Sequence, residues 1–260
     1  MSNKHNLENS GHLTPQILPP FLSTPTSAVR REAPGGLAEL KHGEYRCRVN
    51  LDLYDSPTCA SLATQAAAGR YLQSVLSTAR EQAIQVRLCE DGYGAWLRVE
   101  DITQLEIAPQ PYHAIALSRT QIQERLPAVI AFTKNAMQQS NYYLWGGTVG
   151  PNYDCSGLMQ TAFAASGIWL PRDSYQQQAF TQSIPLVELD AGDLVFFGTP
   201  EKINHLGLFL GDGYYIHSSG KEQGRNGIGI DRLSELGDKV SQTYYQQFRG
   251  AGRVVVSYCP

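Results

Sequence analysis

Short runs of alternating hydrophobic and polar residues occupy the first half of the chain after residue 43. A period of two residues predicts half-buried β-strands. The clearest run is AIQVRLCE, and it places three apolar side chains on one face, namely Ile84, Val86 and Leu88. Asp91-Gly92 follows this run and is a strong hairpin signal. Together with EYRCRVNLDLY before it and YGAWLRVEDI after it, the run predicts a small all-β unit of about 70 residues.

The hydrophobic period changes to that of a helix from about Thr120. In QIQERLPAVIAFTKNAMQ the apolar stripe consists of Leu126, Val129, Ile130, Phe132 and Thr133. Pro127 lies in the same segment, and a proline is tolerated only near the first turn of a helix. We therefore expect Pro127 to lie near the first turn of this helix.

Two further helices are predicted downstream. SGLMQTAFAASG ends at Gly167, a typical C-terminal stop, and its inward residues are Leu158, Met159, Ala162, Phe163 and Ala165. Asp173 and Gln176 are spaced as a capping box at the start of SYQQQAF.

Five strands follow in the sequence, in DLVFFG, HLGLFLG, YYIHSS, GIGID and RVVVSY. Helices followed by antiparallel strands indicate an α+β domain. Residues 1–36 are polar and rich in proline, which predicts a flexible arm. We expect this arm at 1–36, the all-β domain at 37–112 and the α+β domain at 113–260.

The amino-acid composition limits which classes of molecule the protein can bind. The 260 residues include 21 Lys and Arg against 24 Asp and Glu, a net charge of −3, which provides no basic surface for nucleic acid or an anionic membrane. No run approaches the roughly 18 apolar residues that span a bilayer, and the first residues carry no apolar core of a signal peptide. Five scattered cysteines without a CxxC pair indicate reduced thiols. We expect a cytoplasmic protein.

Cys155 is the first candidate for chemistry, because YYLWGGTVGPNYDCSG leads through a Gly-rich turn into the first turn of a predicted helix. The positive end of the helix dipole lowers the pKa of a thiol placed there, which favours a nucleophile. The alternative for any single cysteine is a small buried hydrophobic residue. We assign that role to Cys47, Cys59, Cys89 and Cys259.

Two histidines in the predicted hairpin HLGLFLGDGYYIHSS are candidates for the base. A three-residue loop at 211–213 pairs Gly207 with His217 and places His205 diagonally on the same face. A thiol hydrolase needs one histidine to move protons and a second polar group to orient it. A slip of one residue would turn one histidine to the opposite face. Zinc bound by Cys155, His205 and His217 is the alternative that these residue types leave open.

Five motifs in order resemble the NlpC-type, papain-like family of cell-wall peptidases. They are Tyr143-Leu144-Trp145-Gly146-Gly147, Asp154-Cys155-Ser156-Gly157, Gly192-Asp193-Leu194-Val195-Phe196-Phe197, His205-Leu206-Gly207 and Ile216-His217-Ser218. DGYGAWLRVED resembles part of a bacterial SH3-like domain. With Pro171-Arg172-Asp173-Ser174, the combination is similar to cyanobacterial γ-D-glutamyl-L-diamino acid endopeptidases. The resemblance implies an α+β fold with an SH3-like barrel before a papain-like domain.

The resemblance also implies roles for individual residues. Cys155 would be the nucleophile, His205 the general base and acid, and His217 the orienting third member, while Tyr143 would lie near the oxyanion. Asp173 and Tyr93 would bind the free amine of an N-terminal L-alanine. Four more residues would line the substrate site: Ser156, Ser174, Asp154 and Trp145.

The implied activity is hydrolysis of the γ-D-glutamyl-L-diamino acid bond in soluble peptidoglycan stem peptides, during cell-wall recycling, without a metal or other cofactor. An amidase or acyltransferase with the same Cys-His core is one alternative, and a non-catalytic peptidoglycan-binding module is another. The diamino acid, diaminopimelate or lysine, and the oligomeric state stay open.

Overall fold

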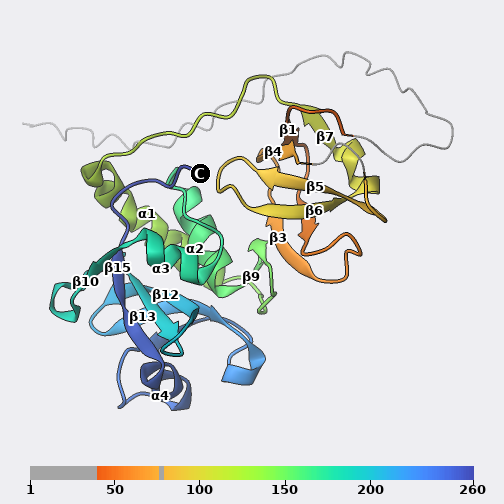
Figure 1. Cartoon of the computed structure of the whole chain (residues 1–260). Helices are drawn as coiled ribbons and strands as arrows, with labels where there is room; N and C mark the ends of the chain where they lie inside the picture. Colours follow the sequence, from red (N-terminus) through yellow and green to blue (C-terminus); the bar gives the residue numbers. More distant parts are fainter. Residues whose placement is uncertain (1–39, 76–78) are drawn as a thin grey trace, which may run out of the picture. The chain divides into compact units, whose positions relative to one another are not determined.

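The computed structural model describes residues 40–75 and 79–260 (Figure 1). The predicted arm at 1–36 lies outside the described residues. Two large sheets organise the described chain, one of seven strands in the N-terminal part and one of six strands in the C-terminal part. Helices precede most strands of the second sheet, so the predicted α+β class is confirmed.

The seven-stranded sheet has the order β3-β2-β6-β5-β4-β1-β7. Its strands are β1 (Glu44–Cys47), β2 (Leu51–Tyr54), β3 (Leu62–Ala66), β4 (Tyr71–Ser74), β5 (Ala83–Leu88), β6 (Gly94–Arg98) and β7 (Leu105–Ile107). A 3-10 helix, η1 (Val99–Gln104), joins the last two strands. The alternation predicted in β5 is confirmed, because Ile84, Val86 and Leu88 are fully buried while Arg87 is exposed.

The stretch rich in Gln and Ala between EYRCRVNLDLY and AIQVRLCE differs from the prediction. It contains β3 and β4, which the sequence pattern did not reveal, and EYRCRVNLDLY divides into β1 and β2. Alanine and glutamine have little intrinsic preference for strands, so burial of residues such as Ala66 and Leu72 determines the conformation.

The six-stranded sheet has the order β10-β15-β11-β12-β13-β14. Its strands are β10 (Gln182–Ile184), β11 (Leu194–Gly198), β12 (Ile203–Gly211), β13 (Tyr214–Ser219), β14 (Gly227–Arg232) and β15 (Phe248–Arg253), and a separate ribbon pairs β8 (Thr148–Val149) with β9 (Asn152–Tyr153). Four α-helices accompany the sheet: α1 (Arg119–Met137), α2 (Cys155–Ala164), α3 (Ser174–Phe180) and α4 (Lys239–Gln246). Short 3-10 helices lie at η2 (Leu186–Glu188) and η3 (Lys221–Gln223).

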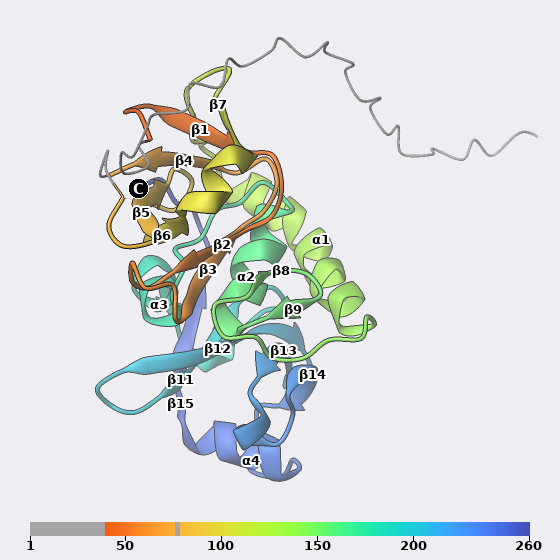
Figure 2. The same cartoon turned by 90° about the vertical axis from the view of Figure 1, so that its right-hand side faces the viewer.

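Helices α1 and α2 lie on one side of this sheet and α4 lies on the other (Figure 1 and Figure 2), and buried side chains pack on both faces. Along β11, Leu194 and Phe196 pack into the core beneath α1 and α2. Val195 and Phe197 pack on the other face with Tyr244 of α4. A central strand covered on both faces reads as a continuous hydrophobic run, which explains the pattern LVFFG.

Helix α1 begins at Arg119, close to the predicted change of period at about Thr120. Ser118 and Gln121 form a capping box, in which the Ser118 hydroxyl accepts from the Gln121 N–H and the Gln121 side chain accepts from the Ser118 N–H. Pro127 therefore lies in the helix interior on an exposed position, and the expectation that it marks the first turn is wrong. The apolar stripe itself is correct, because Val129 and Thr133 are buried.

Two other predictions in this domain are wrong. RVVVSY is not a strand, because β15 ends at Arg253 and residues 254–258 run on without regular structure. Small residues of β15 instead fit between β10 and β11, where Ala251 is opposite both Ile184 and Val195. Ala165 is exposed rather than inward, since α2 ends at Ala164.

Hydrogen bonds connect the two domains directly. The side-chain oxygen of Gln65 in β3 accepts from the N–H groups of Thr148 and Val149, at 3.1 and 3.0 Å. The Thr148 hydroxyl donates to the Gln65 carbonyl at 2.8 Å. The N-terminal domain is thus tied to the ribbon that immediately precedes α2.

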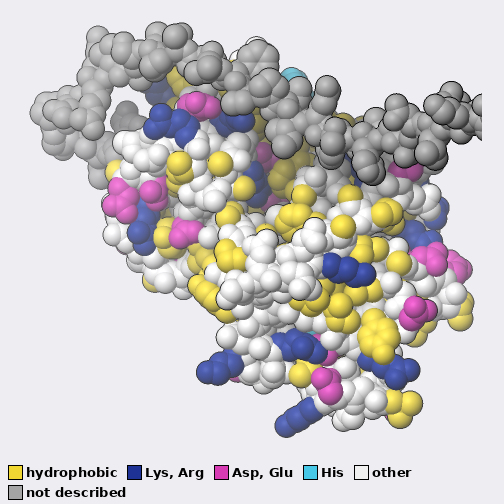
Figure 3. All heavy atoms as spheres, turned by 180° about the vertical axis from the view of Figure 1, so that it is seen from behind, with side chains coloured by type: hydrophobic (Ala, Val, Ile, Leu, Met, Phe, Trp, Pro, Cys, Tyr) yellow, Lys and Arg dark blue, Asp and Glu magenta, His cyan; other side chains and the backbone are white. Residues whose placement is uncertain are grey.

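Charged side chains of both signs are interspersed on the face shown in Figure 3, in agreement with the small net charge. Among the residues that the structure describes, no helix is both long enough and apolar enough to cross a bilayer.

Candidate active site

Cys155 is the first residue of α2, and Asp154 is its N-cap. The Asp154 carboxylate accepts from the N–H of Gly157 at 2.6 Å and from that of Gly146 at 2.9 Å. A side chain on Gly157 would collide with the backbone of Gly147, because an added Cβ would lie 2.0 Å from its carbonyl oxygen. The Gly residues of YLWGG and DCSG therefore let the loop pack against the start of the helix and hold Cys155 in place.

Cys155 is only 5% exposed. Burial, with the Asp154 charge as the second cause, raises the pKa of Cys155 to about 12, and this outweighs the backbone N–H groups of Ser156 and Leu206. The expectation of a lowered pKa is wrong for the free protein. Cys155 therefore keeps its proton until a base removes it.

The histidine hairpin has the predicted facing but a different turn. Phe209 is opposite Tyr215 as predicted, whereas Gly211 rather than Leu210 is opposite Tyr214. The loop has two residues, Asp212 and Gly213, both with positive φ, and a bulge before Gly211 compensates for the missing residue. The register toward the histidines is consequently unchanged.

His205 on β12 and His217 on β13 point toward each other. The distance from His205 Nε2 to His217 Nδ1 is 2.6 Å. Gly207 lies beside them, and an added Cβ there would lie 3.2 Å from the His217 Cβ. The Cys155 Sγ is 3.9 Å from the carbonyl oxygen of Asn204, the residue before His205. The structure thus brings the three predicted catalytic residues to one place.

Asp231 on β14 extends this set and was missed in the sequence. Its Oδ2 lies 2.7 Å from His217 Nε2. Arg225 Nε donates to the same Oδ2 at 2.6 Å. The signal was present in GIGID, because pairing β13 with β14 places Asp231 opposite Tyr215 and Gly229 opposite His217.

Burial determines the protonation of the two imidazoles. His217 is fully buried and His205 is 7% exposed. Burial lowers the pKa of His205 well below its usual range, and the neighbouring His217 lowers it further. Burial also lowers the pKa of His217, although Asp231 partly opposes this. Both rings are therefore neutral at pH 7, as a general base requires.

Arg172 forms a buried link beneath the nucleophile. It is 2% exposed, and its Nη2 donates to Asp154 Oδ2 at 2.6 Å. Its Nη1 donates to the hydroxyl of Ser156 at 3.0 Å, and its Nε donates to the hydroxyl of Thr64, in β3, at 2.9 Å. Both oxygens of Asp154 are thus occupied by protein donors, so Asp154 holds the helix start. Asp154 and Ser156 also line the cavity above Cys155, and their contact with substrate stays a prediction. Ser156 is engaged in the same network.

A cavity of about 380 Å³ opens above Cys155. Tyr143, Trp145 and Ser174 line it, as predicted, and Trp145 is 72% exposed at its edge. Burial raises the pKa of Tyr143 well above its usual range, so its hydroxyl is a proton donor. Polar lining residues that sequence reasoning missed include Asp55, Lys202 and Asn204.

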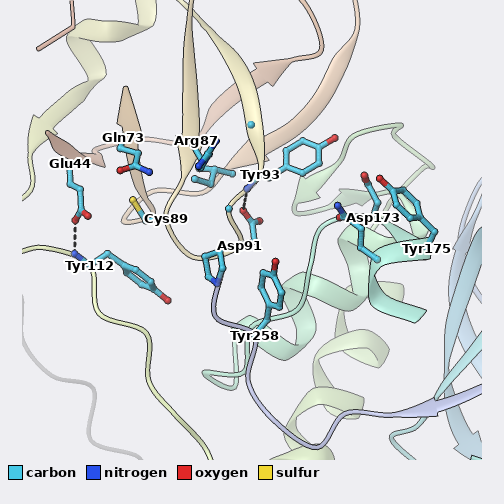
Figure 4. A pocket seen from close by; sticks show the side chains of 15 residues that line it. Glu44, Gln73, Arg87, Cys89, Asp91, Tyr93, Tyr112, Asp173, Tyr175 and Tyr258 are labelled. Atoms are coloured by element: carbon cyan, nitrogen blue, oxygen red, sulfur yellow. Dashed lines mark hydrogen bonds between the residues drawn. The ribbon is translucent and has the colours of Figure 1, made fainter. Parts of the chain in front are cut away.

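Tyr93 from the N-terminal domain and Asp173 from the start of α3 also line this cavity. Burial raises the pKa of Tyr93 to about 12, with the Asp173 charge as the second cause. Asp173 donates its N–H to Gln176 Oε1 at 3.1 Å, which confirms a capping role for Gln176. Tyr93, Asp173 and Tyr175 also border a second cavity of about 690 Å³, shown in Figure 4.

This geometry fits nucleophilic catalysis better than zinc binding. Both ring nitrogens of His217 are engaged, one by His205 and one by Asp231. Within residues 40–75 and 79–260, no group of three or more His, Cys, Asp or Glu is arranged to hold a metal ion. A neutral thiol beside a chain of hydrogen-bonded imidazoles can instead transfer its proton and attack a carbonyl carbon.

Comparison with known proteins gives two family matches. Residues 140–250 match the NlpC/P60 family, and residues 53–102 match the bacterial dipeptidyl-peptidase SH3 domain.

Individual relatives are similar over shorter stretches. A gamma-D-glutamyl-L-lysine dipeptidyl-peptidase of Bacillus subtilis is 44% identical over 79 residues, which are 29% of this chain and 27% of that protein. A protein of the same name from Bacillus cereus is 33% identical over 114 residues, 43% of this chain and 32% of that protein. The alignments thus span less than a third of either relative. A solved NlpC/P60 family protein from Bacillus cereus covers 82% of this chain and 64% of its own, at 24% identity and a TM-score of 0.45.

Proposed function

Because the chain carries an NlpC/P60 domain at residues 140–250 and a bacterial dipeptidyl-peptidase SH3 domain at residues 53–102, we propose that it is a cysteine peptidase that hydrolyses the γ-D-glutamyl-L-diamino acid bond of peptidoglycan stem peptides. The observation that carries the proposal is that Cys155 lines a cavity whose walls also include Tyr93 and Asp173. The Cys155 Sγ lies 3.9 Å from the carbonyl oxygen of Asn204, next to His205, and His205 Nε2 lies 2.6 Å from His217 Nδ1. The names of the two Bacillus relatives support the same bond.

The reaction begins with transfer of the Cys155 proton to His205. The thiolate attacks the γ-carbonyl carbon of D-glutamate, and the resulting oxyanion accepts hydrogen bonds from Tyr143 and from the N–H of Cys155, which has no acceptor within its own helix. His205 then gives its proton to the departing amine of the diamino acid. Water, deprotonated by His205, hydrolyses the thioester and restores the thiol.

The free L-alanine amine is the second element of the proposal. Asp173 and Asp55 place two carboxylates on the cavity wall, and Tyr93 adds a hydroxyl acceptor. A protonated amine pairs well with such a set. Burial raises the pKa of Asp173, and the positive charge of Arg172 opposes this rise. A bound ammonium group would favour the ionised form of Asp173 further.

A requirement for a free amine would limit the substrate to peptides detached from the glycan, because attachment converts this amine to an amide. Peptide recycling is therefore the process we propose. Among the residues that line the cavity, Lys202 is the cation available to a carboxylate of the substrate. Its Nζ lies 5.9 Å from the centroid of the Tyr175 ring. The other lining cation, Arg172, is occupied by Asp154.

The test is mass spectrometry of products from L-Ala-γ-D-Glu-diaminopimelate, its lysine counterpart and the N-acetylated form of each. Release of the diamino acid from the free-amine peptides alone, abolished in Cys155→Ala, supports the proposal. Equal cleavage of acetylated peptides would remove the amine-binding role of Asp173 and Tyr93. Failure to cleave any of them would refute the proposed substrate.

A further inference from the structure

Beyond the triad, we propose that Asp231 is a positioning residue that sets the tautomers of both histidines and so leaves the correct nitrogen of His205 free for the Cys155 proton. The inference rests on the proposed function for its catalytic consequence, although its structural part can be measured without a substrate.

Asp231 is held as an ionised acceptor. It is 3% exposed, and Arg225 binds both of its oxygens, with Nε on Oδ2 and Nη2 on Oδ1. The hydroxyl of Ser241 lies 3.4 Å from Oδ1. Burial alone would raise the pKa of Asp231, but the hydrogen bonds from Arg225 and His217 outweigh burial and hold the pKa well below its usual range. An ionised carboxylate can only accept hydrogen bonds.

The proton position on His217 follows from this acceptor. His217 Nε2 lies 2.7 Å from Asp231 Oδ2, so Nε2 must carry the proton. Since the buried ring is neutral, it has a single N–H, and Nδ1 is left with a lone pair.

The same reasoning applies to His205. Its Nε2 lies 2.6 Å from the lone pair on His217 Nδ1, so Nε2 must donate. The neutral ring of His205 then has its lone pair on Nδ1, the nitrogen closer to the main chain. Cys155 Sγ is 3.9 Å from the carbonyl oxygen of Asn204, the residue before His205. Because His205 Nε2 is engaged by His217, Nδ1 is the ring nitrogen of His205 that can take the thiol proton.

The surroundings of Asp231 are built for this contact. Gly229 stands opposite His217 in the β13–β14 ladder, and an added Cβ at Gly229 would lie 2.6 Å from the Arg225 side chain. The missing side chain thus leaves space for Arg225 beside the carboxylate. Asp238, the other acidic partner of Arg225, lies 3.9 Å from it and is 62% exposed.

Replacement of Asp231 by Asn preserves the size of the side chain but allows it to donate or accept. His217 can then carry its proton on Nδ1, which would force His205 Nε2 to accept and would place the His205 proton toward Cys155. In a serine peptidase triad, the same substitution lowers kcat about 10⁴-fold through the wrong tautomer. We expect about 10²-fold here, because one more imidazole separates Asp231 from the nucleophile.

The test is nitrogen NMR of ¹⁵N-histidine-labelled full-length protein at pH 7, which distinguishes the Nδ1–H and Nε2–H tautomers. Both His205 and His217 should be Nε2–H in the wild type, and Asp231→Asn should redistribute both. The rate of Cys155 alkylation by iodoacetamide, read by peptide mapping, should fall about tenfold or more in Asp231→Asn. The matched control is Asp238→Asn, which changes an Arg225 partner that does not contact histidine and should leave tautomers and alkylation unchanged.

An Nδ1–H or doubly protonated His217 in the wild type would overturn the inference without any variant. So would an Asp231→Asn protein that loses stability but keeps wild-type tautomers and alkylation, because Asp231 would then be purely structural. If the wild type fails to cleave the tripeptide, the proposed function is refuted, whereas the NMR result still decides the role of Asp231.

Discussion

The buried pair between Arg172 and Asp154 should be costly to break. In Arg172→Met the stem is retained but the guanidinium is lost, which leaves the Asp154 carboxylate, 6% exposed, without its counter-charge. The change also removes the donors to Thr64 and Ser156. Water cannot replace the lost charge contact, because the side chains of both partners are buried.

The magnitude follows from these contacts. Removing one partner of a buried ion pair costs about 3–5 kcal/mol of unfolding free energy. Asp154 keeps its bonds from the N–H groups of Gly157 and Gly146, which offsets part of that cost. The lost bonds to Thr64 and Ser156 add about 1 kcal/mol each. We expect a net loss of about 3–5 kcal/mol, a fall of about 1.5–2.5 M in the urea midpoint for a slope near 2 kcal/mol/M.

Urea unfolding followed by tryptophan fluorescence and circular dichroism measures this loss. Arg87→Met is the matched control, because Arg87 is exposed on β5, and it should change the unfolding free energy by less than about 0.5 kcal/mol. A double-mutant cycle with Asp154→Asn should show a coupling above about 1.5 kcal/mol. A loss below about 1 kcal/mol for Arg172→Met would refute the reasoning that this charge pair holds the start of the nucleophile helix.

Three further predictions concern the site. Tyr143→Phe removes one oxyanion donor and should lower kcat about 10–100-fold with KM within about threefold, as steady-state kinetics on the tripeptide would show; an unchanged kcat would exclude Tyr143 from the oxyanion site. Lys202→Gln should raise KM about 3–10-fold with little change in kcat, and an unchanged KM would mean that Lys202 does not bind a substrate carboxylate. Because burial lowers the pKa of both His205 and His217, the unfolded state binds more protons as pH falls below about 6.5, so stability should decline with falling pH by up to about 1.4 kcal/mol per pH unit for each histidine. Urea titrations between pH 5.5 and 7 test this, and His217→Gln should reduce the slope; a slope unaffected by that substitution would contradict the assignment.

The sequence predicted the parts of the site that depend on local pattern. The helix start at Cys155 and the facing of His205 and His217 follow from a Gly-rich turn and from strand alternation, and both are found in the structure. The facing survived an incorrect loop length only because a bulge before Gly211 restores the register. The alternation of side chains along the strands therefore predicted the positions of His205 and His217 better than the predicted turn did.

Features that depend on tertiary packing were not predictable in the same way. The pKa of Cys155 responds to burial, which outweighs the helix dipole that the sequence suggests. RVVVSY has strong strand propensity but lies beyond β15, whereas β3 forms from LATQA. Asp231 lies 14 residues from His217 and reaches it only through the pairing of β13 with β14.

The central claim is that Cys155 forms a thioester with the L-Ala-γ-D-glutamyl group. Intact-protein mass spectrometry after rapid acid quenching of the wild type with the tripeptide tests it most directly. We predict an added mass equal to that acyl group, mapped to the peptide containing Cys155 and absent in Cys155→Ala. An adduct on another residue, or tripeptide cleavage by Cys155→Ala, would contradict the account.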